Sequence, residues 1–300
     1  MPQAYNKPVL TIQQQIVQLQ QRGMVITDIP SATHYLSHIN YYRLGAYWLN
    51  FESNHATHAF QQNTTFEQVL NLYIFDRELR LLLLDAIERV EVAIRSQYSY
   101  QLSHQYGSHP HLMQNIYKAP SSYWDYPQAL NQLVKEANAS KEVFAKHLLT
   151  KYAEPLPPVW ATVEIMTIGQ LSKWYENLST SADRNRIARV FNLDEINLVS
   201  FLHHISTVRN LCAHHSRLWN RAFPFTFKLP RNRPVNILTS LNSHTPKQLY
   251  NSLVMLAYLM DQTAPNHHWK VRLLSLINQH NINTNLMGFP LNWQNKPIWL

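Results

Sequence analysis

The chain has 300 residues, of which 45% are hydrophobic and 12% aromatic, so it can bury a packed core and is not an intrinsically disordered protein. Its 26 Lys and Arg residues against 18 Asp and Glu give a formal net charge of +8, which favours a polyanionic partner. Nucleic acid is favoured over a membrane, because no segment has the pattern of a basic amphipathic helix that lies on a membrane surface.

Cysteine usage and the apolar segments indicate the compartment. The single cysteine, Cys212, excludes an intrachain disulfide and with it a secreted disulfide scaffold. The N-terminal MPQAYNKPVLTIQQQ lacks the pattern of a signal peptide, and the longest strongly apolar run, LRLLLLDAI, is too short to span a bilayer. We therefore expect a cytoplasmic protein without a membrane partner.

The sequence pattern in the first half of the chain predicts helices. Only five glycines occur in 300 residues, against a usual share of about 7%, so helix is the default. Apolar residues at three-and-four spacing predict a first helix from Ile12, with Gly23 as its C-cap. A second begins at Thr64 or Thr65, with Glu67 completing a capping box, and its apolar period continues over about ten turns.

The pattern weakens between residues 105 and 160, where Pro, Ser and His are frequent, and we expect an insertion there with one short helix near residues 128–150. Helical periods resume over 158–178, 181–191 and 192–220. The Pro-broken segment 223–236 is expected to be extended, with a possible short hairpin, and Thr245 is expected to cap a later helix. The predicted fold is an all-α bundle over residues 63–260, preceded by an N-terminal helical and aromatic extension (1–62) and followed by a helical C-terminal tail packed on the bundle (261–300).

The segment HHISTVRNLCAHHSRLWNRAF, residues 203–223, contains four histidines and three arginines. If residues 205–221 form one helix, a turn of 100° per residue separates an apolar from a polar face. His215 falls on the apolar face and is expected in the core, whereas His203 and His204 carry no distinct geometric argument. The apolar face comprises Ile205, Val208, Leu211, Cys212, His215, Leu218 and Trp219; the polar face includes Arg209, Asn210, His214, Arg217 and Arg221.

Arg209 and His214 flank the small Ala213 on this polar face, and Asn210 is placed to orient the His214 ring through a hydrogen bond. Arginine suits bidentate binding of a phosphodiester, and histidine can move a proton from a ribose 2′-hydroxyl or to a leaving 5′-oxygen. From spacing alone, an ordinary solvated surface is the favoured alternative.

The string RNLCAH, Arg209 to His214, resembles the R-x(4–6)-H motif of HEPN-superfamily ribonucleases, and RNLCAHHSRLWN resembles the signature of the Abi-like (AbiD/AbiF) abortive-infection family. Upstream blocks resemble the same family in order: KPVLTIQQQIVQLQQRGM, INYYRLGAYWLNF and TFEQVLNLYIFDRELRLLLLDAIERVEVAIRS. The resemblance covers residues 7 to about 260. It implies a HEPN-like bundle, a homodimer that joins two motifs into one site, and metal-independent endoribonuclease activity in phage defence without a cofactor.

By this resemblance Arg209, Asn210 and His214 are the catalytic residues. Arg217 and Arg221 are expected to guide the RNA strand. A second motif within the chain is not found, because Tyr100 to Leu102 stand where a histidine should follow Arg95 and His104 comes too late. A dimer is therefore expected.

Two other blocks have competing interpretations. Glu88, Glu91 and Arg95 share a face of the long helix, and the favoured interpretation is a surface Glu91–Arg95 ion pair; in the alternative, Glu88 or Glu91 faces Arg209 and fixes its guanidinium. In NYYRLGAYW the tyrosines Tyr41, Tyr42 and Tyr47 with Trp48 are expected in the core and Arg43 at a turn, with RNA base stacking as the alternative.

The leading hypothesis is therefore a toxin-like defence endoribonuclease with RNA as substrate and an antitoxin protein or small RNA as a possible regulator. The alternative is a non-catalytic RNA- or protein-binding module that acts by sequestration. A metal hydrolase ranks third, because no HExxH or carboxylate–histidine cluster has ligand spacing.

Overall fold

A computed structural model describes residues 4, 6–231 and 233–300. The described chain is 62% helix and 3% strand, with thirteen α-helices, which confirms the predicted all-α class. It divides into two compact units. Unit 1 comprises residues 1–79 with 275–282, and unit 2 comprises residues 80–274 with 283–300.

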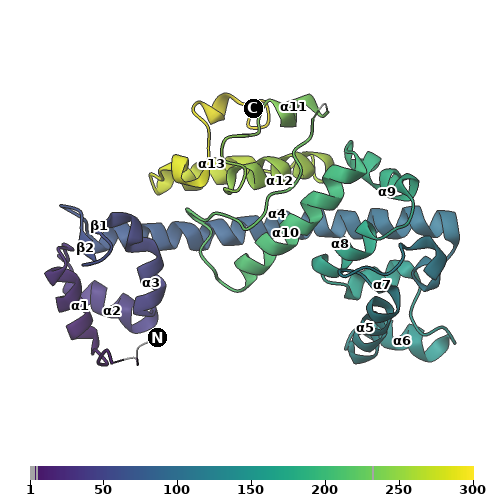
Figure 1. The fold of residues 1–300 in the computed structure, drawn as a ribbon, viewed down its shortest axis with the longest axis horizontal. Helices are drawn as coiled ribbons and strands as arrows, with labels where there is room; N and C mark the ends of the chain where they lie inside the picture. The colour runs from purple at the N-terminus through teal and green to yellow at the C-terminus, as the bar shows by residue number, and fades with distance from the viewer. Residues whose placement is uncertain (1–3, 5, 232) are drawn as a thin grey trace. The chain divides into compact units, whose positions relative to one another are not determined.

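Unit 1 contains α1 (Ile12–Gln21), α2 (Ile29–His38), α3 (Tyr41–Trp48), the 3-10 turn η1 (Leu49–Phe51) and the antiparallel strands β1 (Glu52–Asn54) and β2 (Ala59–Phe60) (Figure 1). Thr11 and Gln14 form a capping box on α1, which buries Ile16 and Leu19 as its apolar period predicts. The C-cap residue is Arg22, and Gly23 follows it at φ +96°, a conformation that glycine adopts without strain.

The aromatic block of α3 is partly buried. Tyr47 and Trp48 lie in the core at 1% and 4% exposure, as predicted. Tyr42 is 73% exposed, so its predicted place in the core is wrong. Arg43 lies within the helix rather than at a turn. Tyr41 is half-buried, and its hydroxyl accepts a hydrogen bond from Arg22 Nη1 at 2.9 Å.

The predicted long helix is α4, which runs for 41 residues from Phe66 to Tyr106. Thr65 caps it and forms a capping box, but the reciprocal partner is Gln68 rather than Glu67: Gln68 N donates to Thr65 Oγ1 at 3.1 Å, and Thr65 N donates to Gln68 Oε1 at 3.0 Å. Apolar residues of the predicted period are buried on both sides of the unit division, which falls between Leu79 and Arg80.

The core of unit 2 is built from α8 (Ile168–Glu176), α10 (Glu195–Ala213) and α12 (Tyr250–Thr263). Residues 250–260 of α12 are all buried, and α10 packs against α8. At the start of α13 (Trp269–Gln279), Trp269 Nε1 donates to the Leu82 carbonyl of α4 at 2.7 Å. The tail, with η5 (Thr284–Met287) and η6 (Trp293–Asn295), returns to α12, where Trp299 Nε1 donates to the Tyr250 hydroxyl at 3.2 Å.

Residues 105–160 hold two helices beyond α4 instead of the predicted one. These are α5 (Tyr126–Ala139) and α6 (Val143–Lys151), preceded by η2 (Pro110–Leu112) and η3 (Gln114–Ile116) and followed by α7 (Val159–Ile165). Ser140 and Glu142 both adopt extended backbone, which interrupts the helical hydrogen bonding between α5 and α6.

Two further expectations on unit 2 are wrong. After α9 (Ser181–Ala188), η4 (Arg189–Phe191) and α10, the described residues of the segment 223–236 contain no strand, so the possible hairpin is not formed there. After the short α11 (Val235–Leu238), α12 starts at Tyr250 and not beside Thr245, whose hydroxyl instead accepts a hydrogen bond from Asn242 Nδ2 at 2.9 Å.

Candidate active site

The helix that carries the R-x(4)-H motif ends within the motif, one residue before its histidine. Helix α10 stops at Ala213, with His214 as C-cap and His215 in the left-handed region at φ +56°. His215 N donates to the Cys212 carbonyl at 3.1 Å, and Ser216 N donates to the Leu211 carbonyl at 2.9 Å. This pair of bonds is a Schellman motif, which satisfies the last carbonyls of the helix. The predicted single helix over residues 205–221 is therefore wrong beyond Ala213.

The buried histidine of this segment is His204 and not His215. His215, expected in the core, is exposed, because its left-handed backbone turns the chain out of the helix. His204 is buried instead at 2% exposure, and its Nε2 lies 2.7 Å from Ser252 Oγ on α12. Leu218 and Trp219 are buried as predicted, although they reach the core from the loop after α10.

The proposed catalytic side chains of Arg209, Asn210 and His214 are all exposed at the C-terminal end of α10. A backbone bond joins two of them, since His214 N donates to the Asn210 carbonyl at 2.9 Å. Among the described residues no hydrogen bond joins the Asn210 amide to the His214 ring, so the ring-orienting role of Asn210 stays a prediction. The end of the helix thus presents a guanidinium, an amide and an imidazole to solvent.

A group of charged side chains from α4 and α7 lies near Arg209. Arg95 donates to Glu91 Oε1 at 2.5 Å, to the Met166 carbonyl at 2.7 Å and to Glu164 Oε2 at 3.4 Å. Burial raises the pKa of Glu91 above its usual range, while the charges of Arg95 and then Arg209 lower it. The Glu91–Arg95 pair is half-buried rather than fully exposed, and Arg209 lies within electrostatic reach of its carboxylate.

Sequence reasoning missed Glu164 in this group. It lies in α7, far from Glu91 in the chain, and no local pattern links the two. Glu88 is exposed, and no contact of its side chain with Arg209 is seen among the described residues. Of the three acidic and basic residues singled out on α4, Glu91 and Arg95 therefore belong to the group beside Arg209.

The two arginines predicted to guide RNA lie in the loop that follows the helix. Arg217 and Arg221 are partly exposed, and Arg221 Nη1 donates to the Arg217 carbonyl at 2.9 Å. Arg80 Nη1 of α4 donates to the Ser216 carbonyl of the same loop at 3.5 Å. The loop that carries Arg217 and Arg221 is thus tied to α4 as well as to α10.

Neither a metal-binding group of side chains nor a membrane-spanning helix is found in the described part of the chain. No group of three or more His, Cys, Asp or Glu side chains is placed to hold a metal ion within residues 4, 6–231 and 233–300. Over the same residues, no helix is long and apolar enough to cross a membrane.

Comparison with known proteins identifies the family. A family model described as Abi-like protein matches residues 34–220, a span that includes α3, α4 and the whole of α10 with the Arg209–His214 motif. No curated protein and no solved structure matches the chain. The family match supports a role in abortive infection, a form of phage defence. Since the match covers more than half of its length, the chain belongs to the Abi-like protein family.

Proposed function

We propose that the protein is a metal-independent endoribonuclease of abortive infection. The observation that carries the proposal is the joint exposure of Arg209, Asn210 and His214 at the end of α10, inside the span matched by the Abi-like family. These three residue types supply a phosphate-binding cation, a neutral hydrogen-bonding group and a proton carrier.

The reaction follows from these groups. An imidazole removes the proton of a ribose 2′-hydroxyl, and the 2′-oxygen attacks the adjacent phosphorus. The bond from phosphorus to the 5′-oxygen breaks, and a second acid protonates that oxygen. The products are a 2′,3′-cyclic phosphate and a 5′-hydroxyl. Arg209 would bind the non-bridging oxygens, whose charge grows in the transition state.

A homodimer is the second element of the proposal. The reaction uses one proton acceptor and one proton donor, while each chain supplies a single motif histidine, His214. A two-fold axis close to the end of α10 would bring a second Arg209 and His214 to the same phosphate. Sedimentation should then give twice the 35.2 kDa mass of one chain.

The direct test is cleavage of labelled single-stranded RNA in EDTA by the wild type and by His214→Ala and Arg209→Ala. Loss of a positioned proton carrier or of a charge-stabilising donor costs about 100-fold or more in rate. His147→Ala and Arg89→Ala are the matched controls, because both residues are exposed, His147 lies on α6, and Arg89 of α4 donates to Asp85 and not to a residue of the motif.

The control variants should cleave like the wild type. Cleavage that persists in both motif variants, or that requires a divalent metal, would overturn the proposal. Tight RNA binding by the wild type without any cleavage would instead favour a module that acts by sequestration.

A further inference from the structure

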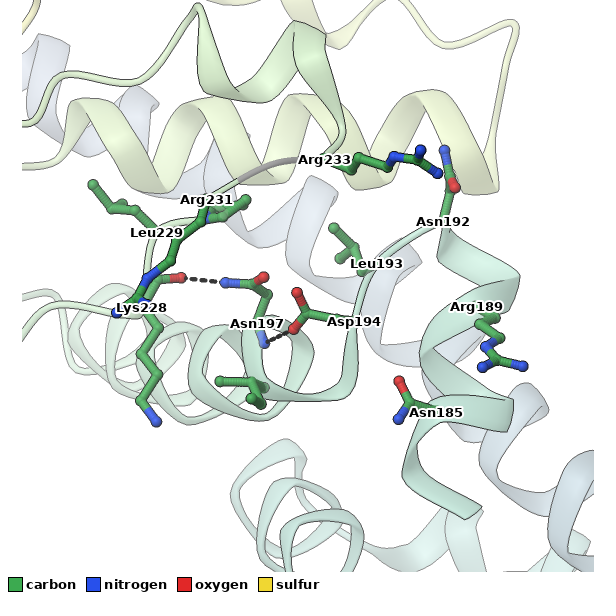
Figure 2. Close-up of a pocket in the computed structure, with 12 residues that line it drawn as sticks. Asn185, Arg189, Asn192, Leu193, Asp194, Asn197, Lys228, Leu229, Arg231 and Arg233 are labelled. Carbon is green, nitrogen blue, oxygen red and sulfur yellow. Dashed lines mark hydrogen bonds between the residues drawn. The ribbon is translucent and has the colours of Figure 1, made fainter. Parts of the chain in front are cut away.

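A cavity lies at the opposite end of α10 from the R-x(4)-H motif. Its volume is about 1140 Å³, and it opens between η4, the start of α10 and the loop that begins at Lys228. Figure 2 shows Asn185 and Arg189 on one wall and Lys228 and Arg231 on the other. Asp194, the N-cap of α10, and Asn197, in its first turn, lie between them.

The cavity is strongly cationic. Arg189, Lys228, Arg231 and Arg233 line it, and all four are exposed. Among the described residues none of these four makes an ion pair with a carboxylate. The one acidic side chain on the wall, Asp194, is occupied as the N-cap of α10, where its Oδ1 accepts from Asn197 N at 2.8 Å. Four cations therefore line the cavity, and the one carboxylate among the lining residues is engaged as a helix cap.

The Lys228 wall is fixed to the helix. Lys228 N donates to Ser200 Oγ at 2.8 Å, and its carbonyl accepts from Asn197 Nδ2 at 2.8 Å. Beside it, Phe227 packs edge to face on Phe201 with ring centroids 5.4 Å apart. The backbone that carries this cation is therefore fixed at both its N–H and its C=O before any ligand binds, so binding does not have to order this part of the chain.

The cavity continues along α10 toward the motif. A smaller cavity of about 250 Å³ shares Ile196 and Lys228 with it and reaches His203. Ile196, His203 and Asn210 recur every seven residues and are all exposed, so they form one line that drifts only about 20° per step. His203 also stacks on Phe225 with centroids 4.8 Å apart, which leaves a flat ring system on this line. At about 1.5 Å per residue, the line from Ile196 to Asn210 is roughly 21 Å long.

We infer that this cationic cavity and the exposed line of α10 bind single-stranded RNA and deliver it to Arg209 and His214. The inference rests on the proposed function and assigns the strand-holding residues for it. The four cations of the cavity bind phosphates, and His203 with Phe225 offers a stacking surface to a base. A polymer suits the site better than a free nucleotide, because the two adjoining cavities and the exposed residues beyond them extend over a distance that one nucleotide cannot fill.

The test measures binding in a background that cannot cleave. Arg189→Glu with Lys228→Glu is introduced into His214→Ala, and fluorescence anisotropy reports the affinity for a labelled, unstructured RNA of 20 nucleotides at several salt concentrations. The matched control is Lys141→Glu with Lys146→Glu, which changes net charge equally at two exposed positions near the start of α6. Circular dichroism and thermal melting verify that both double variants are folded.

The cavity variant should lose roughly tenfold or more in affinity, while the control changes by less than about threefold. For the cavity variant, the slope of log K against log salt should decrease in magnitude by about 1.4, because two phosphate contacts are lost and each contributes about 0.7 for single strands. Equal affinities or equal slopes for the two variants overturn the inference. The inference is also overturned if a mononucleotide binds the wild type as tightly as the 20-nucleotide RNA does and loses the same affinity in the cavity variant.

The two proposals fail separately. If the wild type cleaves RNA in EDTA but the cavity variant binds like its control, the strand-holding site is wrong and the ribonuclease remains. If binding depends on the cavity but no cleavage occurs, the ribonuclease is wrong and the RNA site remains.

Discussion

The guanidinium of Arg209 on α10 lies near enough to the carboxylate of Glu91 on α4 for its charge to lower the pKa of that carboxyl, against the larger effect of burial. Glu91 is at the same time ion-paired with Arg95, which also binds Glu164 and the Met166 carbonyl. A half-buried carboxylate held by Arg95 is suited to fix the position of an exposed arginine within its electrostatic reach. We therefore propose Glu91 as a positioning residue for Arg209.

Glu91→Gln should lower the rate of RNA cleavage about tenfold, equivalent to about 1.4 kcal/mol, because the amide keeps a hydrogen-bonding oxygen for Arg95 but lacks the charge that faces Arg209. The loss should fall mainly on kcat, since Arg209 is proposed to act on charge that develops in the transition state. Single-turnover and steady-state kinetics measure both constants.

Glu88→Gln is the matched control, because Glu88 is exposed on the same helix, one turn before Glu91. It should cleave like the wild type. Equal activity in the two glutamine variants would remove Glu91 from the site.

Gly288 is the glycine whose replacement should damage unit 2 most. It has φ +83°, and a Cβ there would lie 2.8 Å from Gln248 Cβ and 2.8 Å from Thr245 Oγ1. Gly288→Ala should therefore lower the free energy of unfolding by about 1–3 kcal/mol or more, from both backbone strain and overlap. Urea denaturation measures the change.

Gly169→Ala provides the comparison. Gly169 lies in the first turn of α8, and its nearest neighbour to an added Cβ is Thr167 Oγ1 at 3.8 Å. This variant should be neutral or more stable by up to about 1 kcal/mol. A Gly288→Ala protein as stable as Gly169→Ala would contradict the packing described around η5.

The buried His204 should make unit 2 sensitive to acid. Burial lowers its pKa from 6.5 to about 4, so the unfolded chain binds a proton more readily than the folded chain between these values. Stability that is complete above pH 6.5 is therefore lost as the pH falls toward 4. At pH 5 the loss from His204 is about 2 kcal/mol, and His111, whose pKa burial lowers to about 3, adds a similar amount.

His204→Gln should flatten this dependence by about 2 kcal/mol between pH 7 and pH 5, whatever its effect on stability at pH 7. The exposed His147→Gln should keep the wild-type dependence. Urea unfolding at the two pH values gives the difference directly. An unchanged pH dependence in His204→Gln would show that folding does not lower the pKa of His204.

The sequence predicted the long helices well and the end of α10 badly, for a physical reason. Helix α4 has a capping residue, Thr65, and an uninterrupted apolar period, which are local signals. The stop of α10 has no glycine or proline to mark it, because His215 takes the left-handed position. Leu218 and Trp219 are buried all the same, so their spacing imitates a helix that continues.

The candidate site was predictable only in its local part. The motif locates Arg209 and His214 in the chain, but the neighbourhood of Arg209 joins α4, α7 and α10, and the cationic cavity joins residues near 190 to residues near 230. Such groupings depend on tertiary packing, which no spacing pattern in one sequence encodes. The exposure of His215 likewise follows from where the helix ends, whereas His204 is buried because it lies one turn before Val208 on the apolar face of α10.

The most direct measurement of the central claim pairs an RNA oligonucleotide with the same sequence carrying 2′-deoxyribose throughout, each incubated in EDTA with the wild type and with His214→Ala. Cleavage by attack of the 2′-oxygen predicts that the wild type cuts the RNA alone, that the 5′ fragment ends in a 2′,3′-cyclic phosphate or its hydrolysis product, and that His214→Ala is slower by about 100-fold or more. Cleavage of the deoxy substrate, or equal rates for the wild type and His214→Ala, would contradict it.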